Sequence, residues 1–503
     1  MPNYGFLIDQ SRCIGCHACT VACKLENAVP LGVFRTWVKY VEKGAFPDTR
    51  RYFQVTRCNH CANPPCVYIC PTRAMYRRPD GIVEFDPDRC IGCKACMQAC
   101  PYDAIYIDPE NHTAAKCHFC SHRTDLGLEP ACVIVCPTHA IIAGDLDDPE
   151  SEIFRRLAAR DASVRRPEQG TRPKLFYIGA DEATLSPEAA RRDQYIFAEW
   201  GPTAYTGPLT PETLAGAPAR TVYDVPHERP WHWPVPVYLV TKAAGAGVYF
   251  LASLGLALGL FGSEVFFGLG AGLLAAALTA ITGLLLVADL ARPERFIYVL
   301  LKAQPRSWLA LGGYILGIFG VWVGLWWVLR LLGLRSVADG LAYPGALLAL
   351  AAAGYTAFLL GQCEGRDLWQ SPLLLPHLLA EAILAGAALL LAGPALGLAS
   401  GGEGELLRPV FLGALLAHGL FVGAEFAGRH PTLAARLAAK RIIAGPYRGL
   451  FWGGAVGAGI LLAGTIALLP GPAFWALGGL LSIIGLLAYN WAFIMGPQEI
   501  PNS

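Results

Sequence analysis

The pattern of hydrophobic and polar residues divides this chain of 503 residues into two unlike halves. Residues 1–230 contain most of the charged residues and prolines, whereas Leu, Ala and Gly dominate from about Pro236 to Met495. Eight apolar runs in the second half are long enough to cross a bilayer as helices. They cover residues 236–261, 265–288, 308–332, 341–362, 373–393, 407–427, 449–469 and 473–494. So many long uncharged runs do not suit a soluble core, and the sequence predicts an all-α polytopic membrane domain.

The first half has the short mixed elements of an α+β domain. Residues 140–160 indicate a strand end, an acidic turn and an amphipathic helix, and RPKLFYIG at 172–179 favours a final strand. The segment 181–234 is rich in Pro, Gly, Thr and Arg. We therefore predict three regions, namely an α+β domain over 1–180, a linker over 181–234 and a membrane domain over 235–503.

Sixteen of the 17 cysteines lie within the first 140 residues, in four quartets. The first and third quartets follow CxxCxxCxxxC, and a proline follows the last cysteine of the second, third and fourth. This spacing is the signature of bacterial ferredoxins. It predicts a ferredoxin-like domain with four 4Fe–4S clusters. The quartets are Cys13, Cys16, Cys19 and Cys23; Cys58, Cys61, Cys66 and Cys70; Cys90, Cys93, Cys96 and Cys100; and Cys117, Cys120, Cys132 and Cys136.

Zinc sites and disulfides are the alternatives for such cysteines. Zinc takes four ligands and gives no reason for a third CxxC step followed by CxxxCP. Disulfides would require an exported, oxidised domain. The spacing therefore favours iron–sulfur clusters. Cys363 lies outside the quartets, and we expect it to be a packing residue.

Charged residues in the short loops indicate the orientation of the membrane domain. With eight spans, both ends of that domain lie on the side of the cysteine-rich domain. Ten Lys and Arg residues fall in loops on that side, against three on the other. Cytoplasmic loops are enriched in these residues, so we expect the cysteine-rich domain in the cytoplasm of a prokaryotic cell, at the inner membrane. The first residues, MPNYGFLIDQSRC, show neither an apolar signal region nor a twin-arginine leader, which favours the same side.

The quartets, with GDLDDPES at 144–151, resemble the iron–sulfur subunits of the molybdopterin oxidoreductase family, which serve dimethyl sulfoxide, polysulfide and formate enzymes. The second half, with DLARPERF at 289–296, PRSW at 305–308 and GRDLWQSPLLLP at 365–376, resembles the NrfD-like membrane subunits of polysulfide reductases. The resemblance implies a fusion of two proteins that are usually separate.

The family pattern pairs the first quartet with the fourth and the second with the third. Carried over to this chain, each cluster takes three cysteines from one quartet and one from its paired quartet. The implied sets are Cys13, Cys16, Cys19 and Cys136; Cys117, Cys120, Cys132 and Cys23; Cys58, Cys61, Cys66 and Cys100; and Cys90, Cys93, Cys96 and Cys70.

The resemblance also implies a function and partners. A cluster held by four thiolates has no open coordination position, so the chain would be a non-catalytic subunit. Its partner would be a catalytic molybdopterin subunit with molybdenum or tungsten, and it would exchange electrons with menaquinone or ubiquinone among the membrane lipids. The formal net charge of +1 gives no reason to expect a nucleic-acid partner. A redox-driven ion-translocating subunit fed by ferredoxin or a hydrogenase is the alternative.

Ionisable residues inside the spans are candidates for a quinone site because they are costly to bury in a bilayer. Quinone chemistry moves two protons with two electrons, and it needs hydrogen-bond donors and a proton route. We expect the site between the first, second, fifth and sixth spans, with Glu381 in its proton path. The candidates are Tyr238, Lys242, Asp289, His377, Glu381, His418 and Glu425.

Other roles remain open for several of these residues. Lys242 could extend its amine to the lipid headgroups. Asp289 could pair with Arg292, and Glu425 with Arg429. Two histidines on facing spans, His377 and His418, could also hold a haem.

Overall fold

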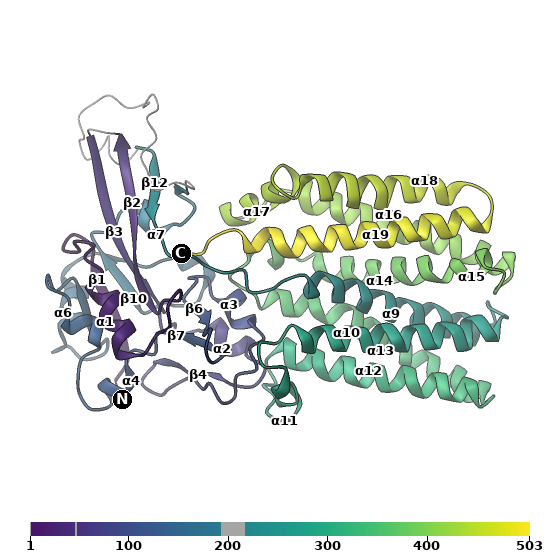
Figure 1. The fold of residues 1–503 in the computed structure, drawn as a ribbon, viewed down its shortest axis with the longest axis horizontal. Coiled ribbons are helices and arrows are strands. Elements are labelled where there is room, and N and C mark those ends of the chain that lie inside the picture. Colours follow the sequence, from purple (N-terminus) through teal and green to yellow (C-terminus); the bar gives the residue numbers. More distant parts are fainter. Residues whose placement is uncertain (1, 46–47, 193–216) are drawn as a thin grey trace. The chain divides into compact units, whose positions relative to one another are not determined.

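The computed structural model describes residues 2–45, 48–192 and 217–503 (Figure 1). The chain forms two compact units, one of residues 1–228 with 501–503 and the other of residues 229–500. We call them the cysteine-rich unit and the membrane unit, and each is described by itself.

A four-stranded sheet in the order β8-β1-β10-β9 lies in the cysteine-rich unit. Strand β1 (Tyr4–Asp9) pairs antiparallel with β8 (Ile141–Asp145) and parallel with β10 (Leu175–Ile178), and β9 (Ala162–Ser163) completes the sheet. Helix α6 (Glu152–Ala159) packs on β8 and buries Ile153 against Leu7 and Ile142. The strand and helix predicted around residues 140–179 are therefore confirmed.

A second sheet has the order β11-β12-β2-β3. The long hairpin of β2 (Thr36–Ala45) and β3 (Asp48–Arg57) is joined by β12 (Ala219–Tyr223), which pairs with β2, and by β11 (Ala190–Arg192). The segment 181–234, expected as a linker, thus contributes two strands and the short helix α7 (Glu182–Leu185) to this unit. Its residues 193–216 lie outside the described part.

Short helices carry the cysteines. Helices α1 (Ala18–Glu26), α2 (Pro65–Ile69), α3 (Ala95–Ala99) and α5 (Ala131–Ile134) belong to the four quartets in order, and α4 (Ser121–Thr124) precedes α5. Helix α1 packs against α5, and α2 packs against α3. Two small hairpins lie between quartets: β4–β5 (Met75–Arg77, Val83–Phe85) between the second and third, and β6–β7 (Ile105–Ile107, Ala114–Lys116) between the third and fourth. The first quartet therefore meets the fourth, and the second meets the third.

Eight helices of the membrane unit are long and apolar enough to cross a bilayer, as predicted. Two contain a π-helical start, and the fifth continues through a short helix. The spans are α9 (Pro234–Ala257), η2 with α10 (Glu264–Ala288), α12 (Trp308–Leu331), α13 (Arg335–Gly361), α14 with α15 (Leu374–Ala395), α16 (Gly401–Ala427), η5 with α18 (Leu450–Leu468) and α19 (Pro472–Gln498).

Two spans begin well before their apolar runs. Helices α13 and α16 each start six residues before the predicted run. In α16 the polar first turn is helical because it is capped. In α16 the Ser400 side chain accepts from the Glu403 N–H, and the Glu403 carboxylate accepts from the Ser400 N–H. The loops between spans also contain four short helices. These are η3 (Pro293–Arg295), α11 (Tyr298–Leu301), η4 (Asp367–Gln370) and α17 (Leu433–Ile443).

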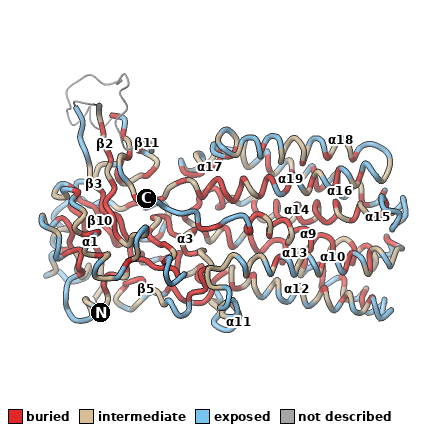
Figure 2. Tube along the Cα trace, in the orientation of Figure 1, coloured by how far each residue is buried: buried red, intermediate tan, exposed pale blue. Residues whose placement is uncertain are grey.

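The spans pack as two neighbouring sets. Helices α9, α10, α12 and α13 form one set, and α14, α16, η5 with α18, and α19 form the other. Helices α9 and α14 join the sets and are mostly buried, whereas α12 and α16 expose much of their surface (Figure 2). The exposed positions include large apolar residues such as Val321 and Leu416, which suits contact with lipid.

Candidate functional site

The local backbone of the quartets sets the cysteine side chains at turns. In the first and third quartets a glycine and the residue two positions later adopt positive φ, at Gly15 and His17 and at Gly92 and Lys94. These left-handed positions let the chain curl so that successive cysteines face inward. Backbone N–H groups also point at the sulfur atoms, since Ala114 donates to Cys90 Sγ at 3.3 Å and Ala140 to Cys136 Sγ at 3.2 Å.

The sulfur atoms of paired quartets lie near one another, and we describe them by the four sets that the family resemblance implies. Group I takes three cysteines from the first quartet and one from the fourth, and group II takes three from the fourth and one from the first. Group III takes three from the second quartet and one from the third, and group IV takes three from the third and one from the second. The groups are I, Cys13, Cys16, Cys19 and Cys136; II, Cys23, Cys117, Cys120 and Cys132; III, Cys58, Cys61, Cys66 and Cys100; and IV, Cys70, Cys90, Cys93 and Cys96.

The four groups also follow one another in a line. Cys19 of group I lies within electrostatic range of Cys132 of group II. Cys117 of group II interacts with Cys58 of group III. Group III meets group IV through Cys66 and Cys96. The arrangement offers one continuous route for electrons through the unit.

The spacing of the sulfur atoms argues against zinc. At a Zn–S distance of about 2.3 Å, tetrahedral ligands lie within about 4 Å of one another. Within the described ranges, no cysteine group has its sulfur atoms close enough together to hold a single metal ion, as a zinc site would require. The 17 cysteines, all within the described ranges, form no disulfide with one another. Wide groups of four thiols fit cubane clusters, which would be held by these sulfur atoms and would supply reversible one-electron chemistry.

Burial sets the protonation state of the thiols in the absence of a metal. It raises the pKa of Cys19 and of Cys23 to about 12, since a thiolate is poorly solvated in the protein interior. Without a metal these side chains would be protonated at neutral pH. Binding of iron must therefore release protons from them.

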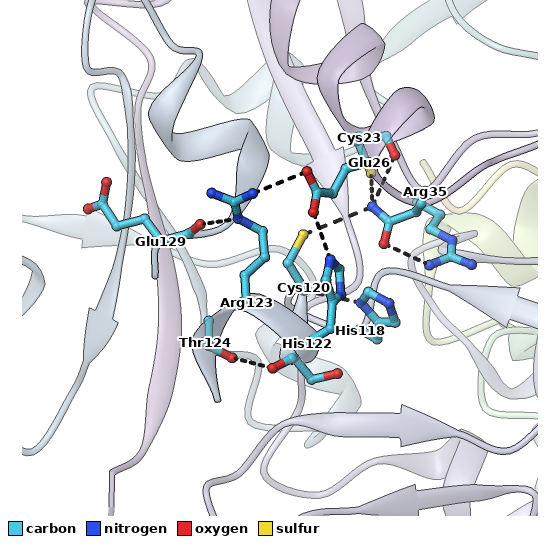
Figure 3. A network of polar contacts seen from close by, with 11 residues as sticks. Cys23, Glu26, Arg35, His118, Cys120, His122, Arg123, Thr124 and Glu129 are labelled. Carbon is cyan, nitrogen blue, oxygen red and sulfur yellow. Dashed lines mark hydrogen bonds and ion pairs between the residues drawn. The ribbon is translucent and has the colours of Figure 1, made fainter. Parts of the chain in front are cut away.

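A polar network covers group II, as Figure 3 shows. Asn27 Nδ2 donates to Cys23 Sγ at 3.7 Å and to Cys120 Sγ at 3.9 Å. Glu26 accepts from Arg123 at 3.2 Å and contacts His122 at 2.8 Å, which links α1 to α4. Burial lowers the pKa of His118 to about 3, so this imidazole is neutral, and its Nδ1 accepts from the Cys120 N–H. The network holds the two halves of group II together.

The membrane unit contains a second candidate site, which we call the histidine–glutamate group: His377, Glu381 and His418. His377 Nε2 and His418 Nδ1 are 2.8 Å apart, and Glu381 Oε1 lies 3.7 Å and 3.9 Å from these two nitrogens. All three side chains are buried. They come from α14 and α16, near the end of the unit where α9 begins and α19 ends.

Helix α19 contributes two further residues that the sequence did not indicate. The Tyr489 hydroxyl lies 3.4 Å from His377 Nδ1, and Asn490 Nδ2 donates to Glu381 Oε2 at 3.2 Å. Glu381 Oε1 has no hydrogen-bond partner in the described parts of the chain. Asn490 is a polar residue inside an apolar run, which is the signal that could have identified it.

The remaining candidates are distributed around this group. Lys242 is buried and does not reach toward headgroups, because its Nζ donates to Ala353 O at 2.9 Å and to Thr356 Oγ1 on α13. Tyr238 lies buried near Thr356, and Lys242 is within electrostatic range of Glu381. Asp289 caps the end of α10 and is half-buried. Tyr238 and Lys242 come from the first span and Asp289 from the end of the second, whereas their partner Thr356 lies on the fourth.

Two expected alternatives change with the structure. The Glu425 carboxylate accepts from Ser371 Oγ at 2.6 Å, whereas Arg429 is exposed. His377 and His418 contact each other directly. Ring nitrogens 2.8 Å apart leave no room for a haem between them.

The opposite end of the membrane unit holds a buried arginine. Arg330, near the end of the predicted third span, pairs with Glu264 at 2.9 Å and with Asp339, and its side chain is 1% exposed. These partners lie on η2 and α13, so the ion pairs join three spans. We therefore interpret the ion pairs of Arg330 as structural contacts between these spans.

Fold and site together define a membrane-anchored electron-transfer protein with iron–sulfur clusters. Three family matches support this class: a 4Fe–4S binding domain over residues 4–25, a 4Fe–4S dicluster domain over residues 49–146, and the polysulphide reductase NrfD family over residues 221–501. The chain belongs to the NrfD family and carries a 4Fe–4S domain at its N-terminal part. The expected fusion is confirmed.

Known relatives match the cysteine-rich part. A subunit of the tetrathionate reductase of Salmonella typhimurium is 48% identical over 201 residues, which is 39% of this chain and 80% of the relative. A component of the polysulfide reductase of Wolinella succinogenes is 45% identical, over 35% of this chain and 94% of the relative. The thiosulfate reductase electron transfer subunit PhsB of Salmonella typhi is 45% identical, over 32% of this chain and 90% of the relative. This chain is similar to iron–sulfur subunits of reductase complexes.

Proposed function

We propose that this chain holds four 4Fe–4S clusters and passes electrons between a catalytic molybdopterin subunit and the membrane quinone pool. The linear order of groups I to IV carries the proposal, because a line of closely spaced redox sites is what electron transfer across a domain requires. The similarity to subunits of tetrathionate and polysulfide reductases supports a catalytic partner with molybdenum or tungsten.

Elemental analysis of the complex purified from its native membrane tests both parts of this proposal. We expect about sixteen irons per chain, four for each group, together with molybdenum or tungsten in a partner subunit. Twelve irons would remove one cluster from the proposal. Full iron without either pterin metal would instead favour the alternative, an ion-translocating subunit fed by ferredoxin or a hydrogenase.

We place the catalytic partner on the surface around group I. Cys16 is the exposed cysteine among the described thiols, so an electron can leave or enter there. Large apolar side chains around it are also exposed, including Ile14 at 57%, Val21 at 64% and Leu25 at 85%. Val21 and Leu25 are four residues apart on α1 and share a face. Exposed apolar residues beside a redox ligand suit a protein that docks and exchanges electrons.

At the membrane, we propose that the histidine–glutamate group moves the protons of the quinone reaction. One of the two hydrogen-bonded histidine nitrogens donates and the other accepts, so the pair can pass a proton along the line from Tyr489 through His377 to His418. Glu381 Oε1 faces both histidines and retains a free acceptor position within the described chain. A carboxylate and imidazoles in this arrangement can give or take a proton at a quinone oxygen.

An apolar groove supports a quinone near this group. It has a volume of about 660 Å³ and lies between α16 and η5. Leu415, Gly419 and Val422 line it, and they neighbour His418 along α16. Phe451 and Trp452 line the other wall. An isoprenoid tail of a quinone matches this groove in polarity, since the lining is almost wholly apolar.

A further inference from the structure

Arg57 occupies an unusual position for a cation. It ends β3 and directly precedes Cys58 of group III. Its side chain is fully buried and lies over the ring of Phe6, with 4.6 Å between the guanidinium carbon and the ring centroid. No carboxylate pairs with it among the described residues. A buried cation without an acidic partner is strongly disfavoured unless other negative charge compensates it.

With a cluster bound in group II, the negative charge that faces Arg57 would come from cysteine thiolates. Its Nη1 donates to Cys132 Sγ at 2.9 Å. The guanidinium also lies within electrostatic range of Cys117 in group II and of Cys19 in group I. Together with Cys120 and Cys132 it lines the space inside group II.

Two donors of the guanidinium are left over. Nε and Nη2 are buried and have no hydrogen-bond partner among the described protein atoms. Buried N–H groups are normally satisfied, so these two require an acceptor that the protein chain does not supply. The sulfur atoms of a cluster in group II provide acceptors next to Cys132.

We propose that Arg57 is a positioning residue that sets the reduction potential of the cluster in group II. The potential of an iron–sulfur cluster depends on its net charge and on the hydrogen bonds to its sulfurs. Addition of one electron makes the site more negative by one charge, and a fixed cation in a buried environment stabilises that extra charge. Arg57 therefore raises the potential of group II above the value that the thiolates alone would give. Group I, reached only through Cys19, should feel a weaker effect.

This inference rests on the proposed four-cluster function and has a direct consequence for electron flow. In a line of four sites, a raised potential at the second site makes it a temporary resting place for an electron between group I and group III. Arg57 thus influences the order in which the clusters become reduced, without contacting quinone or the catalytic partner.

A redox titration followed by electron paramagnetic resonance tests the inference on the full-length chain in its purified complex. Arg57→Gln removes the charge and keeps a donor, and we expect the midpoint potential of one cluster to fall by at least 59 mV, a tenfold change in a one-electron equilibrium. Arg57→Lys keeps the charge but loses the planar set of guanidinium N–H donors, and we expect a smaller fall in the midpoint potential of the same cluster. Arg155→Gln, an exposed position on α6, is the matched control and should leave all potentials unchanged.

Iron content separates the possible failures. Fewer than about sixteen irons in the wild-type complex would overturn the four-cluster function itself. With full iron, unchanged potentials in both Arg57 variants would overturn the role assigned to Arg57. If the glutamine variant loses iron, the lysine variant decides, and unchanged potentials in that cluster-loaded variant overturn the proposal.

Discussion

Glu381 shows at the scale of single residues why the histidine–glutamate group suits proton transfer. The side chain is 1% exposed, and Oε1 has no hydrogen-bond partner within the described ranges. A charged carboxylate in that place would be costly unless a proton or a cation compensated it. Lys242 lies within electrostatic range, and the two histidine nitrogens face the same oxygen. Glu381 is therefore held where its carboxylate can exchange a proton at a small cost in free energy.

Glu381→Gln keeps the shape and the hydrogen bond to Asn490 but removes the titrating oxygen. We expect quinone-linked turnover of the complex to fall by roughly tenfold or more, in the range of a lost general acid or base. Iron content and activity with a soluble redox dye, which bypasses the membrane unit, should stay unchanged.

Glu405→Gln is the matched control, since Glu405 is an exposed carboxylate on α16. It should leave quinone-linked turnover as in the wild type. Wild-type quinone turnover in a fully assembled Glu381→Gln complex would show that this residue has only a structural role.

The same residues show what the sequence could and could not predict. The depth of Glu381 in its span identified it as a candidate, because burial in a bilayer follows from hydropathy alone. Tyr489 and Asn490 could not be placed, since they meet His377 and Glu381 across more than 100 residues of chain. The ion pairs of Arg330 could not be predicted either, because Glu264 and Asp339 lie on other elements. Contacts between spans leave no periodic signal in the sequence.

At the scale of elements, glycines decide how closely helices approach. Helices α9 and α14 cross with backbone against backbone, because a Cβ atom at Gly386 would lie 2.2 Å from the carbonyl carbon of Gly247. A Cβ atom at Gly247 would lie 1.7 Å from Ala382 O. Small residues at such crossings allow close packing of membrane helices. This crossing brings Lys242 on α9 near the turn of α14 that holds Glu381.

Gly386→Val should separate the two helices, because the new side chain would meet backbone that cannot rotate away. We expect a loss of stability of about 1–3 kcal/mol, the usual range for overpacking. A thermal unfolding scan of the solubilised protein measures it as a lower midpoint temperature. Gly413→Val on α16 meets no atoms within 4 Å and is the control. Equal midpoints for the two variants would argue against a tight crossing.

At the scale of the whole molecule, the fusion fixes one cysteine-rich unit to one membrane unit. The number of spans and the quartets were predictable because hydropathy and cysteine spacing are local properties of the sequence. The fold of segment 181–234 was not, since β12 pairs with β2 at a distance of about 180 residues along the chain. The residues 501–503 also belong to the cysteine-rich unit, where the Asn502 carbonyl accepts from Arg165 at 2.6 Å. Strand β1 and residues 501–503, at opposite ends of the sequence, therefore share one unit.

Loop charge predicts that this unit faces the cytoplasm, and an epitope can test the orientation. The turn at Pro149 is exposed in the cysteine-rich unit, and Leu398 is exposed in the loop between the fifth and sixth spans. A short epitope inserted after Pro149 should bind antibody only after spheroplasts are lysed. The same epitope after Leu398 should bind on intact spheroplasts, because an odd number of spans separates the two sites and places them on opposite sides. Antibody binding to the Pro149 epitope on intact spheroplasts would reverse the orientation, and with it the side on which the catalytic partner and the protons of the quinone reaction are found.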